Sequence, residues 1–209
     1  MRYERKYRIE NHAYQQVLQS MMSIPGAFNE AYPDRWVNSI YMDDLDFKAL
    51  NDNLSGISHR SKYRLRWYGN DLRNIENPVL EKKIKENMLG YKELIQMNSF
   101  HNSPNDLRRA LDIPLLRDES ILPVVIVKYL RTYLQSFDKR VRITIDRNLQ
   151  YLGMTHYAMD PFPLRDTAII LEVKYDQDIE DDITEILQAI PYRLTKNSKY
   201  CSGMIHYWE

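Results

Sequence analysis

The stretch Ser61-Lys62-Tyr63-Arg64-Leu65-Arg66-Trp67-Tyr68 alternates cationic side chains with large apolar or aromatic ones. Residues i and i+2 of a β-strand point to the same face of the sheet, so the stretch predicts a strand with its cations on one face. The apolar side chains would lie on the opposite face, where they can pack against helices. Cations in such a row repel one another when no anion lies between them. The pattern fits either the wet face of an ordinary antiparallel sheet or a surface that binds a polyanion.

Charges spaced two residues apart recur in four other stretches, Glu4-Arg5-Lys6, Glu81-Lys82-Lys83, Arg140-Val141-Arg142 and Glu172-Val173-Lys174. Arginine carries a rigid fork of donors that matches phosphate oxygens. Carboxylates would repel such a ligand unless a divalent cation, Mg²⁺ or Mn²⁺, is held between them and the phosphates. Glu172 and Glu81 are therefore the best candidate metal ligands and Glu4 is the third. A salt bridge to a neighbouring cation is the structural alternative for each.

The composition predicts a single domain over residues 1–209, because 44% of the residues are apolar and can form a sizeable core. The 29 basic and 29 acidic residues balance, which argues against binding nucleic acid through overall basicity. The longest apolar run, Ile121–Val127, is far shorter than the ~18 residues of a membrane-spanning helix. The N-terminus lacks the apolar stretch of a signal peptide, and the lone Cys201 fits a reducing compartment. We expect a cytoplasmic protein.

Alternation and turn residues predict strands over residues 2–9, 36–42, 61–68, 79–85, 124–134, 140–146 and 167–175. Helical spacing predicts helices over residues 11–22, 43–53, 104–111, 179–190 and 197–206, the first with Asn11 as its N-cap. Residues 90–96 fit a strand or a short helix, and residues 148–163 hold no clear element. About seven or eight strands with few helices predict an α+β fold, a closed or nearly closed antiparallel β-barrel flanked by helices.

Other chemistries find little support in the sequence. The five histidines, His12, His59, His101, His156 and His206, do not have metal-ligand spacing. The chain has no Gly-x-x-x-x-Gly-Lys loop for nucleotide phosphates, and Ser202-Gly203 does not form a nucleophile elbow. The charged strand faces remain the main candidate for a functional site.

With these segments in order, the chain resembles the VTC domain, the polyphosphate polymerase branch of the CYTH-like triphosphate tunnel metalloenzyme superfamily. The resembling segments are Glu4-Arg5-Lys6-Tyr7, Ser39-Ile40-Tyr41-Met42-Asp43, Arg64-Leu65-Arg66-Trp67-Tyr68-Gly69, Leu80-Glu81-Lys82-Lys83, Pro123-Val124-Val125 with Tyr129 and Arg131, Arg140-Val141-Arg142-Ile143-Thr144-Ile145-Asp146, Leu171-Glu172-Val173-Lys174 and Ser198-Lys199-Tyr200. These segments span nearly the whole chain. The most specific of them are Arg64-Leu65-Arg66-Trp67-Tyr68-Gly69 and Leu171-Glu172-Val173-Lys174.

The resemblance implies a barrel whose interior is a basic tunnel that binds the triphosphate of ATP or a polyphosphate chain. By motif, the catalytic phosphate contacts would be Lys6, Arg64, Arg66, Lys83, Arg131, Arg140, Arg142 and Lys199. Further candidate phosphate-binding residues are Lys62, Lys92, Lys174 and Lys196. The resemblance also implies that Glu172 holds the divalent metal.

The first strand departs from the wider superfamily. The superfamily signature Glu-x-Glu-x-Lys reads Arg2-Tyr3-Glu4-Arg5-Lys6 here, so an arginine replaces one carboxylate on the metal side. This departure favours the polymerase branch over the hydrolases and cyclases. The chain also has neither the regulatory domain nor the membrane helices that accompany this domain in eukaryotic VTC complexes. It resembles the stand-alone bacterial form, and a membrane-protein partner at the inner face of the membrane would be a separate chain.

These features lead to the hypothesis of a metal-dependent polyphosphate polymerase that transfers the γ-phosphate of ATP to a growing chain. The terminal phosphate of the acceptor is already ionised, so the reaction requires positioning and charge neutralisation more than a general base. Two alternatives remain open. One is a hydrolase of triphosphate or nucleoside triphosphate in the same tunnel, and the other is a polyphosphate-binding accessory module without catalysis.

Overall fold

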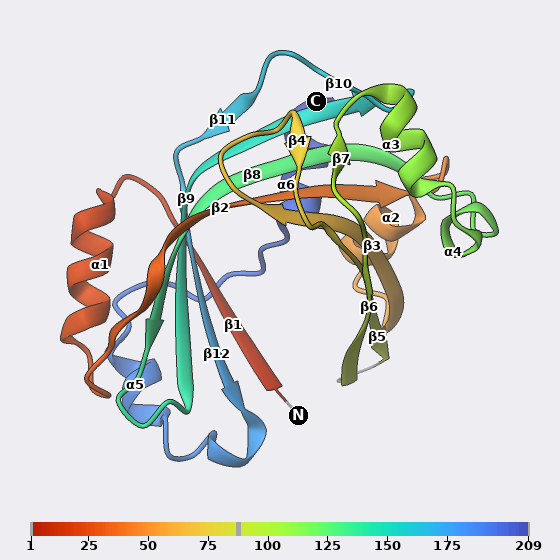
Figure 1. The fold of residues 1–209 in the computed structure, drawn as a ribbon. Coiled ribbons are helices and arrows are strands. Elements are labelled where there is room, and N and C mark those ends of the chain that lie inside the picture. The colour runs from red at the N-terminus through yellow and green to blue at the C-terminus, as the bar shows by residue number, and fades with distance from the viewer. Residues whose placement is uncertain (1, 87–88, 209) are drawn as a thin grey trace. The chain divides into compact units, whose positions relative to one another are not determined.

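The computed structural model describes residues 2–86 and 89–208 (Figure 1). The chain forms two compact units. Unit 1 comprises Met1–Arg35, Tyr129–Leu149 and Asp166–Asn197, and unit 2 comprises Trp36–Lys128, Gln150–Arg165 and Ser198–Glu209. The single domain expected over the whole chain stays a prediction.

The strands are β1 (Arg2–Ile9), β2 (Asn29–Asp43), β3 (His59–Tyr68), β4 (Asn74–Ile75), β5 (Val79–Glu86), β6 (Leu89–Gln96), β7 (Phe100–His101), β8 (Leu122–Gln135), β9 (Val141–Thr155), β10 (Ala158–Met159), β11 (Leu164–Asp166) and β12 (Ile169–Asp176). The helices are α1 (Tyr14–Ser23), α2 (Lys48–Leu54), α3 (Pro104–Leu111), α4 (Pro114–Arg117), the 3-10 helix η1 (Gln177–Ile179), α5 (Thr184–Ala189) and α6 (Lys199–Trp208). Among the described residues, no helix combines the length and the apolarity needed to cross a membrane.

The hydrogen-bonded strand order is β1-β12-β9-β8-β2-β3-β5-β6, with β10 and β11 paired to β9 and with β4 paired to β7. The following strand pairs are antiparallel: β1–β12, β12–β9, β9–β10, β2–β3, β3–β5, β5–β6 and β4–β7. The structure therefore confirms an α+β fold built on a mostly antiparallel sheet. In the described part of the chain, β1 and β6 end the order and no pairing joins them. The pairing thus does not confirm the closed barrel.

In unit 1, the alternation along β1, β12 and β9 separates a core face from a charged face. Figure 1 shows these three strands side by side. Tyr7 pairs with Leu171, and both side chains are buried in a core that includes residues of α1. One residue earlier on β1, Lys6 pairs with Glu172, which in turn pairs with Thr144 of β9. Because successive side chains point to opposite faces, the charged row lies on the face opposite the core.

In unit 2, β3 shows the same separation. Tyr63, Leu65 and Trp67 are buried in one core cluster together with Leu107 and Leu111 of α3. This confirms that the apolar positions of β3 pack against a helix. The intervening cations of β3 therefore lie on the other face of the strand, together with the residues that they pair with on β5.

Two glycines allow α6 to lie close to its neighbouring strands in unit 2. A Cβ atom on Gly203 would lie 3.0 Å from Cδ1 of Tyr151. A Cβ atom on Gly153 of β9 would lie 1.9 Å from Cζ of Tyr207, so the Tyr207 ring covers the backbone there. Larger side chains at either position would displace the helix or the ring.

Strand β9 continues to Thr155, so the expectation that residues 148–163 hold no clear element was wrong. Asn148 has a φ of 54°, which places its backbone in the left-handed region within the strand. This conformation interrupts the alternation of apolar and polar residues, and the second half of the strand was therefore not evident from the sequence. Strand β2 also starts earlier than predicted, at Asn29.

Several helix boundaries differ from the prediction. Helix α1 has Ala13 as its N-cap, and Asn11 has a φ of 59° outside the helix, so the expected Asn11 cap was wrong. Helix α2 begins at Lys48, because the backbone between Asp43 and the helix forms a turn. Residues 179–190, predicted as one helix, contain the end of η1 and the shorter α5. Helix α3 spans the predicted residues 104–111, and residues 90–96 are strand.

Candidate functional site

Predicted site residues gather in two clusters, one in each unit, and Asp146, which was not predicted as a site residue, joins the first of them. The Glu172 cluster consists of Glu4, Lys6, Arg131, Asp146, Glu172 and Lys174 in unit 1. The Glu81 cluster consists of Arg64, Arg66, Glu81 and Lys92 in unit 2.

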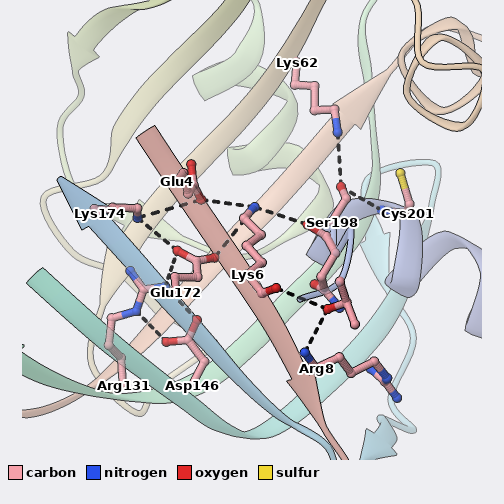
Figure 2. A network of polar contacts seen from close by, with 12 residues as sticks. Glu4, Lys6, Arg8, Lys62, Arg131, Asp146, Glu172, Lys174, Ser198 and Cys201 are labelled. Atoms are coloured by element: carbon pink, nitrogen blue, oxygen red, sulfur yellow. Dashed lines mark hydrogen bonds and ion pairs between the residues drawn. The ribbon is translucent and has the colours of Figure 1, made fainter. Parts of the chain in front are cut away.

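Strand register places opposite charges beside one another in the Glu172 cluster. Lys6 on β1 pairs with Glu172 on β12, and Glu4 pairs with Lys174. The Lys6 ammonium lies 3.1 Å from Oε1 of Glu4 and 3.8 Å from Oε1 of Glu172. The Lys174 ammonium lies 2.9 Å from Oε2 of Glu172 and 4.0 Å from Oε1 of Glu4. Figure 2 shows that the four side chains point toward one another, so two lysines bridge two carboxylates.

Arg131 of β8 completes this cluster through a buried ion pair. Its Nε and Nη2 atoms donate to Oδ1 and Oδ2 of Asp146 at 2.5 and 2.6 Å, and Nη2 lies 3.7 Å from Oε2 of Glu172 (Figure 2). The Asp146 side chain is 0% exposed. Burial acts to lower the pKa of Arg131, but the Asp146 carboxylate outweighs burial and raises that pKa well above its ordinary value. Arg131 is therefore a permanently charged group held in one orientation.

The residues of the Glu172 cluster fit a hard divalent cation that also binds a phosphate ligand. Among the described residues, no group of three or more His, Cys, Asp or Glu side chains could hold a metal by itself. Mg²⁺ and Mn²⁺, however, are commonly held by one or two carboxylates together with substrate phosphates. Glu4 and Glu172 offer such a pair, since both lie within 4 Å of the Lys6 ammonium. Across the strand from Glu172, the buried Oγ1 of Thr144 has no hydrogen-bond partner in the described part of the chain and adds an unused oxygen.

In the Glu81 cluster, three cations surround one buried carboxylate. Nε and Nη2 of Arg64 donate to Oε2 of Glu81 at 3.0 and 2.6 Å. Nη1 of Arg66 lies 3.4 Å from Oε1, and Nζ of Lys92 lies 3.8 Å from Oε2. Burial opposes the ionisation of Glu81, but Arg64 and Arg66 lower its pKa below the ordinary value. Glu81 is thus a charged partner of three cations, and its role as a metal ligand stays a prediction.

A row of three lysines crosses the strands beside the Glu81 cluster. Lys62 on β3 pairs with Lys83 on β5, which pairs with Lys92 on β6. Like charges directly opposite one another destabilise a sheet. Partial burial, with the nearby Arg64, lowers the pKa of Lys92 to about 8. This face of unit 2 therefore favours an anionic ligand that would offset the repulsion.

Tyr41 and Ser39 belong to the same face and were missed as site residues. Tyr41 of β2 pairs with Arg64 and is 8% exposed, and Ser39 pairs with Arg66. Burial acts to raise the pKa of Tyr41, but Arg64, Arg66 and Lys199 lower it below the ordinary value. The Oγ of Ser39 and the Nε of Arg66 are buried without a hydrogen-bond partner among the described residues. The period of two in the segment from Ser39 to Asp43 was the signal that could have identified both residues.

Three other predicted residues lie outside these contacts. Arg140 precedes β9, and its guanidinium is exposed and donates to Asp138 at 2.7 Å and to Asp182 at 2.8 Å. Arg142 is exposed on β9 opposite Lys174, and Lys196 is exposed in the segment before α6. Their phosphate contacts stay predictions.

The fold and the two clusters together define a class of α+β proteins in which the antiparallel strands of each unit carry cations and buried carboxylates on one face. Residues 1–207 match the family model of the VTC domain, so the chain belongs to the VTC domain family. No match was found among curated proteins.

Solved structures show the same fold. A candidate adenylate cyclase from Vibrio parahaemolyticus is similar over 98% of this chain and 97% of its own, with a TM-score of 0.56 and 13% identity. A protein from Pyrococcus horikoshii is similar over 98% of this chain and 99% of its own, with a TM-score of 0.54 and 12% identity. A candidate adenylate cyclase from Bacillus halodurans is similar over 93% of both chains, with a TM-score of 0.54 and 14% identity. At these identities, the similarity establishes the fold alone.

Proposed function

We propose that the chain is a metal-dependent polyphosphate polymerase that transfers the γ-phosphate of ATP to the end of a growing polyphosphate chain. The observation that carries this proposal is the Glu172 cluster. It places two carboxylates within reach of one lysine, beside an arginine whose orientation is fixed by a fully buried aspartate. Membership of the VTC domain family supports the assignment to phosphate chemistry.

Phosphoryl transfer needs positioned donors and neutralised phosphate oxygens. In unit 1, Arg131 offers donors held by Asp146. Unit 2 has its own set of candidate phosphate contacts, the donors of Arg64 and Arg66 that Glu81 holds. Lys6 and Lys174 carry ammonium groups that can turn from the carboxylates to phosphate oxygens. A divalent cation, when bound by Glu172 and Glu4, would neutralise charge on the phosphate oxygens.

The nucleophile in this proposal is an oxygen of the terminal phosphate on the acceptor chain. That oxygen is ionised at neutral pH, so the protein contributes orientation rather than proton abstraction. A new P–O bond forms to the γ-phosphorus of ATP while the bond to the β-γ bridging oxygen breaks, and ADP leaves.

The test is incubation of the purified chain with ATP and Mn²⁺ or Mg²⁺, with products resolved on a polyphosphate-stained gel and free phosphate assayed in parallel. Glu172→Gln should lower chain synthesis by about 10²–10³-fold, the range for loss of one positioned electrostatic group. Glu180→Gln is the matched control, because Glu180 pairs with Arg5 on the opposite face of β1. Chain synthesis within a few-fold of wild type in Glu172→Gln would overturn the assignment of Glu172.

The products also distinguish the alternatives. Free phosphate without chains would identify a hydrolase of triphosphate or of ATP. Absence of both products, with a melting temperature that polyphosphate still raises, would identify a binding module. Dependence on a membrane-protein partner would show as synthesis restored by the membrane fraction of the source cells.

A further inference from the structure

The first turn of α6 is tied to the end of β2 by a buried hydrogen bond. Tyr200, next to Lys199 in this turn, is 1% exposed, and its hydroxyl donates to Oδ2 of Asp43. The Asp43 carboxylate is also 1% exposed and accepts backbone N–H groups from Ala49 at 2.9 Å and Leu50 at 3.0 Å. One buried carboxylate therefore joins β2, the start of α2 and the start of α6.

The Tyr200 ring lies against the cationic face of the sheet. Its centroid is 5.4 Å from that of Tyr41, with an angle of 27° between the rings. The Lys62 ammonium lies 5.6 Å from the same ring, which is a cation–π distance. Tyr41 on β2 pairs with Arg64 on β3, which belongs to the Glu81 cluster. The Tyr200 ring therefore packs against the face of β2 and β3 that carries this cluster.

Lys62 makes further contacts to the same turn. Its ammonium donates to Oδ1 of Asn53 at 2.7 Å and to Oγ of Ser198 at 3.1 Å, the second of which is visible in Figure 2. Nδ2 of Asn53 donates to Sγ of Cys201 at 2.7 Å. These contacts hold Lys62 against the beginning of α6, where it restrains the backbone around Lys199.

Lys199 itself is 7% exposed and, together with Arg64 and Arg66, lowers the pKa of Tyr41. It is therefore a nearly buried cation whose charge acts on Tyr41, the ring that stacks on Tyr200. Burial and the bond to Asp43 raise the pKa of Tyr200 well above its ordinary value, so its hydroxyl remains a donor across the working pH range. A buried donor and a buried carboxylate that satisfy each other have few alternative arrangements.

We propose that Asp43, Tyr200 and Lys62 are positioning residues that hold Lys199 in place for a phosphate oxygen. The inference rests on the proposed function and on the phosphate contact that the family resemblance predicts for Lys199. It changes the role of Lys62, which acts through the first turn of α6 instead of through contact with phosphate. Misplacement of a binding group by about 1 Å can cost 10²-fold in rate, so partial loosening of the turn should be measurable.

The experiment compares Tyr200→Phe with Tyr207→Phe. Tyr207 lies at the other end of α6, and its hydroxyl also donates to an aspartate, Asp160, at 2.9 Å. The affinity for inorganic tripolyphosphate is measured by titration calorimetry, and the melting temperature is measured for each variant. Tyr200→Phe should raise the Kd about tenfold by misplacing a binding group, whereas Tyr207→Phe should leave it within twofold. Equal effects of the two substitutions on Kd would overturn the inference.

A double-mutant cycle then tests whether Tyr200 acts through Lys199. In a Lys199→Ala background, Tyr200→Phe should change the Kd by less than twofold, because the group that it positions is gone. A further tenfold loss in that background would contradict the inference. If Lys199→Ala alone leaves the Kd unchanged, the phosphate contact predicted for Lys199 fails, and the positioning inference fails with it. If Lys199→Ala weakens binding but Tyr200→Phe does not, only the positioning inference fails.

Lys62→Met provides a second variant if Tyr200→Phe does not fold. Methionine retains the apolar stem of Lys62 but loses the ammonium that donates to Asn53 and Ser198. Lys62→Met should weaken tripolyphosphate binding in the wild-type background and have no further effect in Lys199→Ala. Equal loss in both backgrounds would indicate that Lys62 contacts phosphate itself.

Discussion

Replacement of Asp146 by asparagine is the most direct test of the energetics of the Glu172 cluster. The substitution keeps the size of the side chain but removes the charge that neutralises Arg131. In the wild-type protein, both guanidinium donors reach Asp146 at 2.5 and 2.6 Å, and the nearest other carboxylate oxygen, on Glu172, lies 3.7 Å away. The amide that replaces the carboxylate would accept from only one of these donors and would turn an N–H group toward the other.

The expected loss follows from burial. Asp146 is 0% exposed and the Arg131 side chain is 11% exposed, so little water can replace the lost partner. Removal of one member of a buried ion pair costs about 3–5 kcal/mol, because it leaves an uncompensated charge. For a chain of this size, 1 kcal/mol corresponds to about 2–4 °C in melting temperature, so a decrease of about 6–20 °C is expected.

Equilibrium urea denaturation followed by circular dichroism measures this loss as a shift in midpoint at constant m-value. Asp182→Asn is the control, because it removes the same charge from a surface ion pair with Arg140. Solvent screens such an exposed pair, so the pair contributes little to stability. The double replacement Arg131→Met with Asp146→Leu should recover most of the lost stability while weakening tripolyphosphate binding. If Asp146→Asn loses no more stability than Asp182→Asn, the buried pair does not stabilise the fold as argued.

Two further predictions concern ligand binding. Because burial and Arg64 lower the pKa of Lys92 to about 8, the free protein loses this charge as pH rises through 8, and a bound phosphate must restore the proton. The affinity for tripolyphosphate should therefore fall between pH 7 and pH 9 in calorimetric titrations. Lys92→Arg stays charged and should flatten this pH dependence. A pH dependence that is the same in Lys92→Arg and in the wild type would contradict the role of Lys92. Thr144→Val removes a buried hydroxyl that has no partner among the described residues, so it should raise the melting temperature of the free protein. The same substitution should weaken Mn²⁺-dependent tripolyphosphate binding beside Glu172, and a lower melting temperature with unchanged binding would show that the hydroxyl serves the fold alone.

Alternation in the sequence predicted the faces of the strands correctly. Tyr63, Leu65 and Trp67 are buried in the core, and Arg64 and Arg66 lie on the opposite face. This succeeded because the side-chain period of a strand is a local property of the backbone. Family resemblance then supplied the proposed function of the charged faces.

The partners of the charged residues could not be predicted in the same way. Arg131 pairs with Asp146, fifteen positions away, and Tyr200 pairs with Asp43 from the other end of the chain. Such contacts depend on strand register and on helix docking, which no single segment encodes. Asn148 shows the same limit at the backbone level, since one residue with positive φ disrupted the pattern from which the rest of β9 could have been predicted.

The structure also separates two glutamates that the sequence presents alike. Both Glu81 and Glu172 stand two residues before a lysine in a strand. The register gives them different neighbours: Glu81 pairs with Arg64 and Leu94, whereas Glu172 pairs with Lys6 and Thr144.

A divalent cation at Glu81 would meet the guanidinium groups of Arg64 and Arg66 and the ammonium of Lys92, all within 4 Å of the same carboxylate. Glu172 also has three cations within 4 Å, Lys6, Arg131 and Lys174. Beside it, however, lie a second carboxylate, that of Glu4, and the unused hydroxyl of Thr144. Cations surround both carboxylates, so the additional oxygen donors are what favours a metal at Glu172 over Glu81. Glu81 is better suited to hold the forks of Arg64 and Arg66 in a fixed orientation, which leaves their remaining donors for the proposed phosphate contacts.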